Sequence, residues 1–260
     1  MKKYLADLVV SSNEKLHPNY CLLKLTQKDS LPDTLPGQFV EIKVENSPTT
    51  FLRRPISINY VDRRKNELWL LIQIVGDGTR KLSELKEGDI VNLVYPLGNN
   101  FSFPESKNKD EKLLLIGGGV GTAPMLFLGA ELKSQGYEPV FLLGARTSDD
   151  LLQLDIFCQF GIVYTTTEDG SQGEKGYVTD HSILKNQDFD MIYTCGPKPM
   201  MVSVASYAKK AGIACEVSLE NVMACGIGAC LCCVENTIDG HICVCKDGPV
   251  ANIQKLTWQI

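Results

Sequence analysis

The stretch that decides the fold is LLLIGGGVGTAP, residues 113–124. Its first four residues, Leu113 to Ile116, form the continuous apolar run that is typical of a central strand in a parallel sheet, buried on both faces. Four glycines fall within the next five residues, and a helix pattern follows from about Thr122 to Ser134. A strand, a glycine-rich loop and a helix in this order are the context that dinucleotide binding requires.

The glycine-rich loop is not the G-x-G-x-x-G fingerprint, because Ala123 and Pro124 stand where the third glycine is sought. The alternative is a plain tight turn. Four clustered glycines weaken local folding, so packing alone explains them poorly, whereas a phosphate needs the close backbone approach that they allow. We therefore expect a nucleotide pyrophosphate at Gly117, Gly118, Gly119, Val120, Gly121 and Thr122.

Further strands and helices alternate on the carboxyl side of this loop. The patterns predict strands at Val140–Leu143, Met191–Thr194 and Cys215–Leu219, and a helix at Lys198–Lys210. Such alternation predicts a doubly wound parallel sheet, in which ligands bind at the carboxyl ends of the strands. Cys195, just after one strand, is therefore expected to face the nicotinamide crevice; the alternative is a buried structural thiol.

On the amino side, short alternating apolar runs predict an antiparallel β-barrel. The runs are separated by turn signals such as Pro36-Gly37 and Gly88-Asp89. They lie at Tyr20–Thr26, Gln38–Val44, Glu67–Val75 and Ile90–Tyr95, and a short helix is expected at Thr79–Leu85.

Two barrel motifs are typical of a flavin site. Arg53-Arg54-Pro55-Ile56-Ser57 offers a guanidinium fork for a pyrophosphate, beside a hydroxyl. Gly76-Asp77-Gly78-Thr79 offers a glycine turn before a helix. The alternatives are solvated arginines on an edge strand and an ordinary turn capped by Thr79.

A cysteine array lies near the carboxyl end. Cys225, Cys230 and Cys233 have the C-x4-C-x2-C spacing of a plant-type [2Fe–2S] site, while zinc sites favour two close C-x2-C pairs. The alternative is a non-catalytic module with structural zinc. The fourth ligand stays open, because His241 to Cys245 alternates like a strand and would place Cys243 and Cys245 on one face.

Composition excludes several classes of protein. The chain has 260 residues, a formal net charge of −5 and no basic block, so we expect no nucleic-acid partner. No apolar run of about twenty residues is present, so we expect no membrane span, and the amino end does not resemble a signal peptide. Clustered cysteines in so long a chain favour metal ligation in a reducing cytoplasm over disulfides.

The order of these motifs predicts three parts: an FAD-binding β-barrel domain at 1–103, an NAD-binding α/β domain at 112–219 and a [2Fe–2S] subdomain at 220–260. The charged stretch 104–112 is expected to be the boundary between the first two.

Together the motifs resemble the ferredoxin reductase superfamily, and within it the electron-transfer subunits of NAD-dependent (type B) dihydroorotate dehydrogenase. The resemblance covers essentially the whole chain. It is most specific at residues 52–57, 117–124 and 223–230, and it extends to 244–250, where the family's cysteine is the fourth ligand. It therefore implies Cys225, Cys230, Cys233 and Cys245 as metal ligands, with Cys243 left as an extra thiol.

The same resemblance implies an FAD site and a residue beside the nicotinamide. FAD would lie on Arg54, Pro55, Ile56, Ser57, Leu71, Ile72, Gln73, Gly78 and Thr79. Relatives carry a basic residue where this chain has Gln73. Glu220 matches the family's acidic residue before the cluster loop, and with Cys195 it is expected at the site of hydride transfer.

The resemblance implies an oxidoreductase subunit with FAD, a [2Fe–2S] cluster and NAD as cofactors. An FMN-containing catalytic subunit would oxidise dihydroorotate to orotate in pyrimidine (UMP) biosynthesis, and electrons would pass through the cluster and FAD to NAD+. The family assembles as a cytoplasmic heterotetramer with two copies of each chain.

Two questions stay open at this point. Arg146 follows the second strand of the nucleotide domain, where an arginine suits NADP and an acid suits NAD. The nearest rival function is a subunit of a ferredoxin–NADP reductase or sulfide dehydrogenase, whose first cluster ligand can be aspartate; Cys225 argues against that rival.

Overall fold

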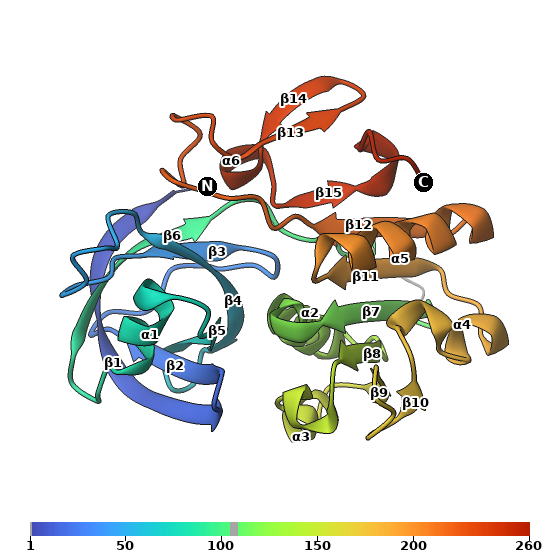
Figure 1. Cartoon of the computed structure of the whole chain (residues 1–260), viewed down its shortest axis with the longest axis horizontal. Helices are drawn as coiled ribbons and strands as arrows, with labels where there is room; N and C mark the ends of the chain where they lie inside the picture. The colour runs from blue at the N-terminus through green and yellow to red at the C-terminus, as the bar shows by residue number, and fades with distance from the viewer. Residues whose placement is uncertain (1, 105–108) are drawn as a thin grey trace. The chain divides into compact units, whose positions relative to one another are not determined.

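The computed structural model describes residues 2–104 and 109–260, which form two compact units (Figure 1). The first comprises Met1–Asn100, Asn221–Glu235 and His241–Pro249, and the second comprises Phe101–Glu220, Asn236–Gly240 and Val250–Ile260. The expected boundary stretch 104–112 includes residues 105–108, which lie outside the described residues. The predicted division at 1–103, 112–219 and 220–260 stays a prediction.

A closed antiparallel barrel makes up most of the first unit, as predicted (Figure 1). Its strands are adjacent in the order β1-β2-β5-β4-β3-β6. Closure pairs every strand on both sides, so the barrel has no open edge. The bounds are β1 Tyr4–His17, β2 Tyr20–Thr26, β3 Phe39–Ile42, β4 Arg54–Asp62, β5 Glu67–Gln73 and β6 Ile90–Leu97, with helix α1 at Asp77–Ser83.

The long strand β1 had no clear signal in the sequence. Of its fourteen residues only Leu8 and Val10 are buried, so its apolar pattern is thin. Two register shifts against β2, after Val10 and after Lys15, break the alternation further. The strand is held instead by its pairing to β2 on one side and β6 on the other.

The second unit is built on a seven-stranded sheet in the order β10-β9-β8-β7-β11-β12-β15. The chain enters at the middle strand β7, runs out through β8 and β9, and returns to β11 and β12 on the other side. The predicted doubly wound parallel sheet is thus confirmed, with its switch point between β7 and β11. Only β15 among the described pairs of this sheet is antiparallel.

The strands and helices predicted for the second unit lie close to their expected ranges, and the structure adds β9, β10, β15, α3 and α4. Its strands are β7 Leu113–Gly118, β8 Val140–Ala145, β9 Ile162–Thr167, β10 Glu174–Lys175, β11 Met191–Cys195, β12 Ala214–Ser218 and β15 Val250–Asn252. Its α-helices are α2 Thr122–Ser134, α3 Leu154–Phe157, α4 Ile183–Asn186 and α5 Lys198–Ala211, and its 3-10 turns are η1 Gly119–Gly121, η2 Ser148–Asp150, η3 Val178–Asp180 and η4 Ile253–Lys255.

Helix α2 is buried along most of its length, because nine of its thirteen residues are buried. A helix that is apolar all round belongs in a protein interior. Gly129 marks the closest approach: a β-carbon built there would lie 2.1 Å from Cζ of Phe141, on β8. The helix that follows the glycine-rich loop is therefore fixed against the sheet.

The cysteine-rich end departs from the predicted strand over His241 to Cys245. Strands β13 Val234–Thr237 and β14 Gly240–Cys243 form a hairpin, but β14 ends at Cys243 and a helical turn, α6 Val244–Asp247, follows. The amide of Cys243 donates to Oδ2 of Asp247 at 2.9 Å, which ties the residue before this turn to its last residue. Cys243 and Cys245 therefore do not share a strand face, and that prediction is wrong.

Within residues 2–104 and 109–260, none of the helices has the length and apolar character needed to cross a bilayer.

We predict that Gly129→Ala destabilises the protein, although alanine favours a helix by about 1 kcal/mol. The new methyl group would overlap the buried Phe141 ring, and overpacking costs about 1–3 kcal/mol net. Thermal unfolding followed by circular dichroism should show a lower Tm.

Gly76→Ala is the matched control, because Gly76 has extended backbone and no atom within 4 Å of the new β-carbon. If Gly129→Ala melted at the parent temperature, the packing of α2 on β8 would not be as tight as described.

Candidate functional site

The glycine-rich loop of the second unit lies at the switch point of the sheet. β7 ends at Gly118, the loop turns through η1, and α2 begins at Thr122. Thr122 Oγ1 donates to the carbonyl of Gly119 at 3.0 Å, which closes the turn. Gly119 has φ +55, a left-handed value that glycine adopts without strain. The amides at the start of this thirteen-residue helix are donors of the kind that can bind a phosphate.

A second predicted loop touches the first directly. A β-carbon at Gly121 would lie 2.5 Å from the carbonyl carbon and oxygen of Cys195, which is backbone and has no room to move. One at Gly118 would lie 2.3 Å from Sδ of Met200. Cys195 pairs in register with Gly117, so both loops leave the sheet at the same edge. The structure thus brings the two predicted nucleotide motifs together.

Cys195 and Glu220 form a pair within the second unit. Cys195 is buried and its thiol donates to Oε1 of Glu220 over 3.9 Å. Burial raises the pKa of Cys195 well above its usual range, and the Glu220 charge raises it further, so the thiol is neutral. Burial of the carboxyl also raises the pKa of Glu220. Because more than a third of Glu220 is exposed, solvent limits that shift.

The predicted flavin motifs meet on the barrel of the first unit. Pro55, Ile56 and Ser57 lie on β4 and pair with β3. Pro55 is opposite Glu41, Ile56 is opposite Val40, and Ser57 is opposite Phe39. A β-carbon at Gly78 would lie 2.9 Å from Nε of Arg54, so the arginine and the glycine turn are in contact. Two segments about twenty residues apart in the sequence therefore form one surface.

The two neighbouring arginines have different roles. The Arg53 guanidinium donates to the backbone carbonyl of Glu41 at 3.2 Å. It also donates to the backbone carbonyl of Asn92, at 3.0 Å, and to the Asn92 side-chain oxygen. Arg53 therefore ties strands β3 and β6 together. Arg54 donates no hydrogen bond within the part of the chain that the structure describes, and its fork remains available to an anion.

The other predicted flavin residues on α1 and β5 are buried or hydrogen-bonded within the first unit. Thr79 Oγ1 accepts from the amides of Val75 and Gly76, at 2.9 and 3.2 Å, so its hydroxyl is used at the start of α1. Leu71 and Ile72 are buried on β5. Gln73 Nε2 donates to the Tyr20 hydroxyl at 3.1 Å, a contact between neutral groups.

The cluster loop points backbone amides at sulfur. The amide of Gly228 donates to Sγ of Cys245 at 3.1 Å, that of Ala229 to Sγ of Cys225 at 3.3 Å, and that of Cys245 to Sγ of Cys233 at 3.3 Å. Such bonds stabilise sulfur that carries negative charge. The amides of Ile227, Cys230 and Ala229 lower the pKa of Cys225 to about 6, despite opposing desolvation.

The four thiols named by the family pattern fall into two pairs. The Cys230 side chain also lowers the pKa of Cys225, while Cys233 raises the pKa of Cys245 and accepts the Cys245 amide at 3.3 Å. Burial raises the pKa of Cys245 to about 12, so this thiol is protonated until a metal replaces its proton. Two pairs of sulfurs suit a cluster in which each iron takes two protein ligands.

The two pairs do not yet form a closed cage. Across residues 2–104 and 109–260, no three His, Cys, Asp or Glu side chains stand in a ready-made metal-binding arrangement. The fit to a [2Fe–2S] cluster thus rests on the spacing, the pairing and the amide donors. Cys243, half-buried at the end of β14, lies outside both pairs.

Glycines shape the loop around these sulfurs. Gly226 and Gly228 have φ +66 and +81, left-handed values that favour glycine. A β-carbon at Gly226 would lie 2.6 Å from Cγ of Glu41 and 3.1 Å from Cδ1 of Leu97. The loop therefore packs directly on strands β3 and β6 of the barrel in the same unit.

Three apolar side chains of the cluster segment face outward. Val222, Ile227 and Leu231 are 79, 51 and 62% exposed, and Cys230 and Cys232 are exposed beside them. Exposed apolar groups gathered in one short segment are typical of a protein interface.

Glu41 is the residue that sequence reasoning missed. It is 1% exposed, and neither carboxyl oxygen has a hydrogen-bond partner among the described residues. Burial raises its pKa to about 7; Cys225 also raises it, whereas Arg53 and Arg54 lower it. A lone acid in the apolar run Gln38–Val44 is the available signal, but strand alternation puts Glu41 on the face opposite Val40 and Ile42 and so gives no sign of its burial.

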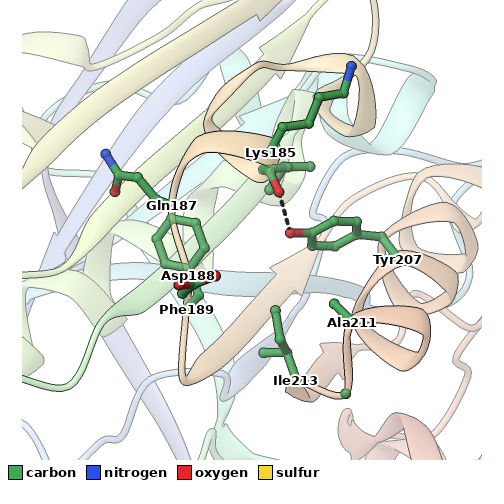
Figure 2. A pocket seen from close by; sticks show the side chains of 9 residues that line it. Lys185, Gln187, Asp188, Phe189, Tyr207, Ala211 and Ile213 are labelled. Carbon is green, nitrogen blue, oxygen red and sulfur yellow. Dashed lines mark hydrogen bonds between the residues drawn. The ribbon is translucent and has the colours of Figure 1, made fainter.

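A pocket in the second unit lies apart from these residues (Figure 2). It is lined from α4 and α5, where the Tyr207 hydroxyl donates to the carbonyl of Leu184 at 2.7 Å. None of the predicted site residues lines it, so it is not the cofactor site described above.

Comparison with protein families agrees with the arrangement of the motifs. The family described as the iron–sulfur cluster binding domain of dihydroorotate dehydrogenase B matches residues 220–257. The family described as the oxidoreductase NAD-binding domain matches residues 115–206.

Solved structures share the fold. A chain of an NADH-dependent reduced ferredoxin–NADP oxidoreductase aligns with a TM-score of 0.86 and 29% identity, over 97% of this chain and 90% of that chain. The ferredoxin reductase of carbazole 1,9a-dioxygenase aligns with a TM-score of 0.69 and 22% identity, over 82% and 67% of the two chains, which supports the fold alone.

Curated relatives are more similar. The dihydroorotate dehydrogenase B (NAD(+)) electron transfer subunit of Fusobacterium nucleatum is 36% identical over 252 residues, covering 94% of this chain and 95% of the relative. That of Bacillus mycoides is 40% identical over 220 residues, covering 83 and 84%. The chain therefore belongs to the family of dihydroorotate dehydrogenase B (NAD(+)) electron transfer subunits.

Proposed function

We propose that this chain carries electrons from a catalytic partner subunit through a [2Fe–2S] cluster and FAD to NAD+. The observation that carries the proposal is the contact of Gly226, in the cluster loop, with Glu41 of β3, opposite Pro55 of the flavin strand. Cluster loop and flavin strand thus belong to one unit of the fold. A bound cluster supplies one-electron steps, and a bound flavin links these to hydride transfer.

The proposed cluster ligands are Cys225, Cys230, Cys233 and Cys245. Cys245 rather than Cys243 completes the set, because its sulfur accepts from the Gly228 amide and its amide donates to Cys233. The Cys243 amide is instead bonded to Asp247. Amides on three of the four sulfurs stabilise the thiolates and help to set the cluster potential.

The proposed FAD site uses the unpaired fork of Arg54 on the flavin pyrophosphate. Gly78 leaves room for that fork, since a side chain there would collide with it. The hydroxyl of Ser57 and the backbone of Leu71 to Gln73 would complete the site. Thr79 supports it indirectly, by holding the turn at Val75 and Gly76.

The proposed NAD site uses the amides of Gly117 to Thr122 for the pyrophosphate. The neutral thiol of Cys195 and its hydrogen bond to Glu220 would line the nicotinamide. The chain itself then binds and orients the nicotinamide nucleotide, while the hydride chemistry belongs to the cofactors.

The partner is proposed to be an FMN-containing dihydroorotate dehydrogenase subunit, in a cytoplasmic heterotetramer with two copies of each chain. The relatives are electron transfer subunits by name, which supports a catalytic partner. Val222, Ile227 and Leu231 offer an apolar surface beside the proposed cluster, where a partner would bring its own redox centre within reach.

A ferredoxin–NADP reductase remains the nearest alternative, favoured by one structural neighbour at 29% identity. The curated relatives are more similar, at 36 and 40%. Co-purification with an orotate-producing subunit separates the two functions.

We predict that Cys230→Ser abolishes electron flow from the partner to NAD+ but spares NADH–dye reductase activity at the flavin. Loss of one ligand removes the cluster, while the flavin strand is not altered. The measurement is both activities and the iron content of the purified complex. Survival of both activities with iron intact would rule out the proposed relay.

We predict that Cys245→Ser loses the cluster and that Cys243→Ser keeps it. The two cysteines are two residues apart, so each variant is the control for the other. Iron and acid-labile sulfide analysis of both proteins gives the answer. The ligand set is wrong if Cys243→Ser is the variant that loses iron.

We predict that Arg54→Ala weakens FAD binding by about tenfold to hundredfold, because a hydrogen bond to a charged group contributes about 1.5–3 kcal/mol. Fluorescence titration of the flavin-depleted complex measures the Kd. Arg80→Ala is the control, since Arg80 is an exposed arginine of the same unit paired with Asp77. Unchanged FAD affinity in Arg54→Ala would contradict the site.

A further inference from the structure

The carboxyl of Glu41 has no place in the electron path described above. It is 1% exposed on a four-residue strand that is buried throughout. Neither oxygen has a hydrogen-bond partner within residues 2–104 and 109–260. A buried acid without partners is costly, so its retention calls for a compensating role.

The surroundings of Glu41 place it between the two proposed cofactor sites of the first unit. Its Cγ and Oε1 would lie 2.6 and 3.3 Å from a β-carbon at Gly226. Arg54, the first residue of β4, and Arg53 before it lower the pKa of this carboxyl by their positive charge. The Cys225 sulfur, in the cluster loop, raises that pKa. Across the strand pair stands Pro55, which has no amide to donate.

Arg53 does not neutralise this acid by a direct ion pair. Its guanidinium is used on the carbonyl of Glu41 and on Asn92, and no salt bridge between it and the carboxyl exists in the described chain. The negative charge therefore acts across a dry environment, where solvent screens it little.

We propose that Glu41 is a positioning residue for the cluster. The Glu41 carboxylate lies under the Cys225–Gly226 turn and lowers the reduction potential of the bound cluster. Adding an electron to a cluster beside a fixed negative charge is less favourable than adding it beside a neutral group. A lower potential favours onward transfer of the electron to the flavin. This inference rests on the proposed function, since it takes Cys225 as a cluster ligand.

The test is the midpoint potential of the cluster in the intact complex, from a titration followed by electron paramagnetic resonance. It is run at about pH 9, which favours the ionised form of the Glu41 carboxyl. Glu41→Gln removes the charge and keeps the shape, and we expect the potential to shift to a more positive value. Glu41→Asp keeps the charge and should stay near the parent.

Glu45→Gln is the matched control. Glu45 lies three residues beyond β3, is 59% exposed and pairs with Lys43. Water and salt screen its charge, so its removal should leave the potential unchanged.

The inference is overturned if Glu41→Gln has the parent's potential, or if Glu41→Asp shifts as far as Glu41→Gln, which would make the effect one of packing. If Glu41→Gln loses iron while Glu41→Asp retains it, the charge is required to position the loop and the inference stands. If both variants lose iron, Glu41 serves packing alone and the inference is overturned. A parent complex without any cluster signal would instead overturn the proposed function.

Discussion

The constraint on which the proposed electron path depends is the packing of one glycine against one barrel strand. Gly226 has φ +66 and no space for a β-carbon, because Glu41 and Leu97 occupy that space. The cluster loop is thus seated on β3 and β6, next to the strand that carries Arg54 and Ser57. A cluster and a flavin held by one unit need no motion between units to exchange an electron.

The nucleotide unit follows the same physical rule. At the switch point of its sheet, Gly121 lies against the carbonyl of Cys195, and Gly118 lies against Met200. In both units close backbone packing excludes a β-carbon, and in the cluster loop backbone amides donate to sulfur. The chain supplies shape and hydrogen bonds, and the bound groups supply the redox chemistry.

Much of this arrangement was predictable because it rests on local patterns. The apolar run Leu113–Ile116 and the glycines after it predicted β7, its loop and α2. Other features depend on partners distant in sequence. β1 has few buried residues of its own, and Cys245 lies in a helical turn whose last residue, Asp247, accepts from the Cys243 amide. The different roles of Arg53 and Arg54 depend on Asn92 and Gly78, which no spacing rule connects to them. Glu41 was missed for the same reason, since the loop that packs on it at Gly226 is distant in sequence.

The most direct test of the central claim is the iron–sulfur content of anaerobically prepared protein. The account predicts acid-labile sulfide and, after dithionite reduction, a rhombic paramagnetic signal that integrates to the flavin content. Flavin-loaded protein with no labile sulfide and no such signal would contradict it.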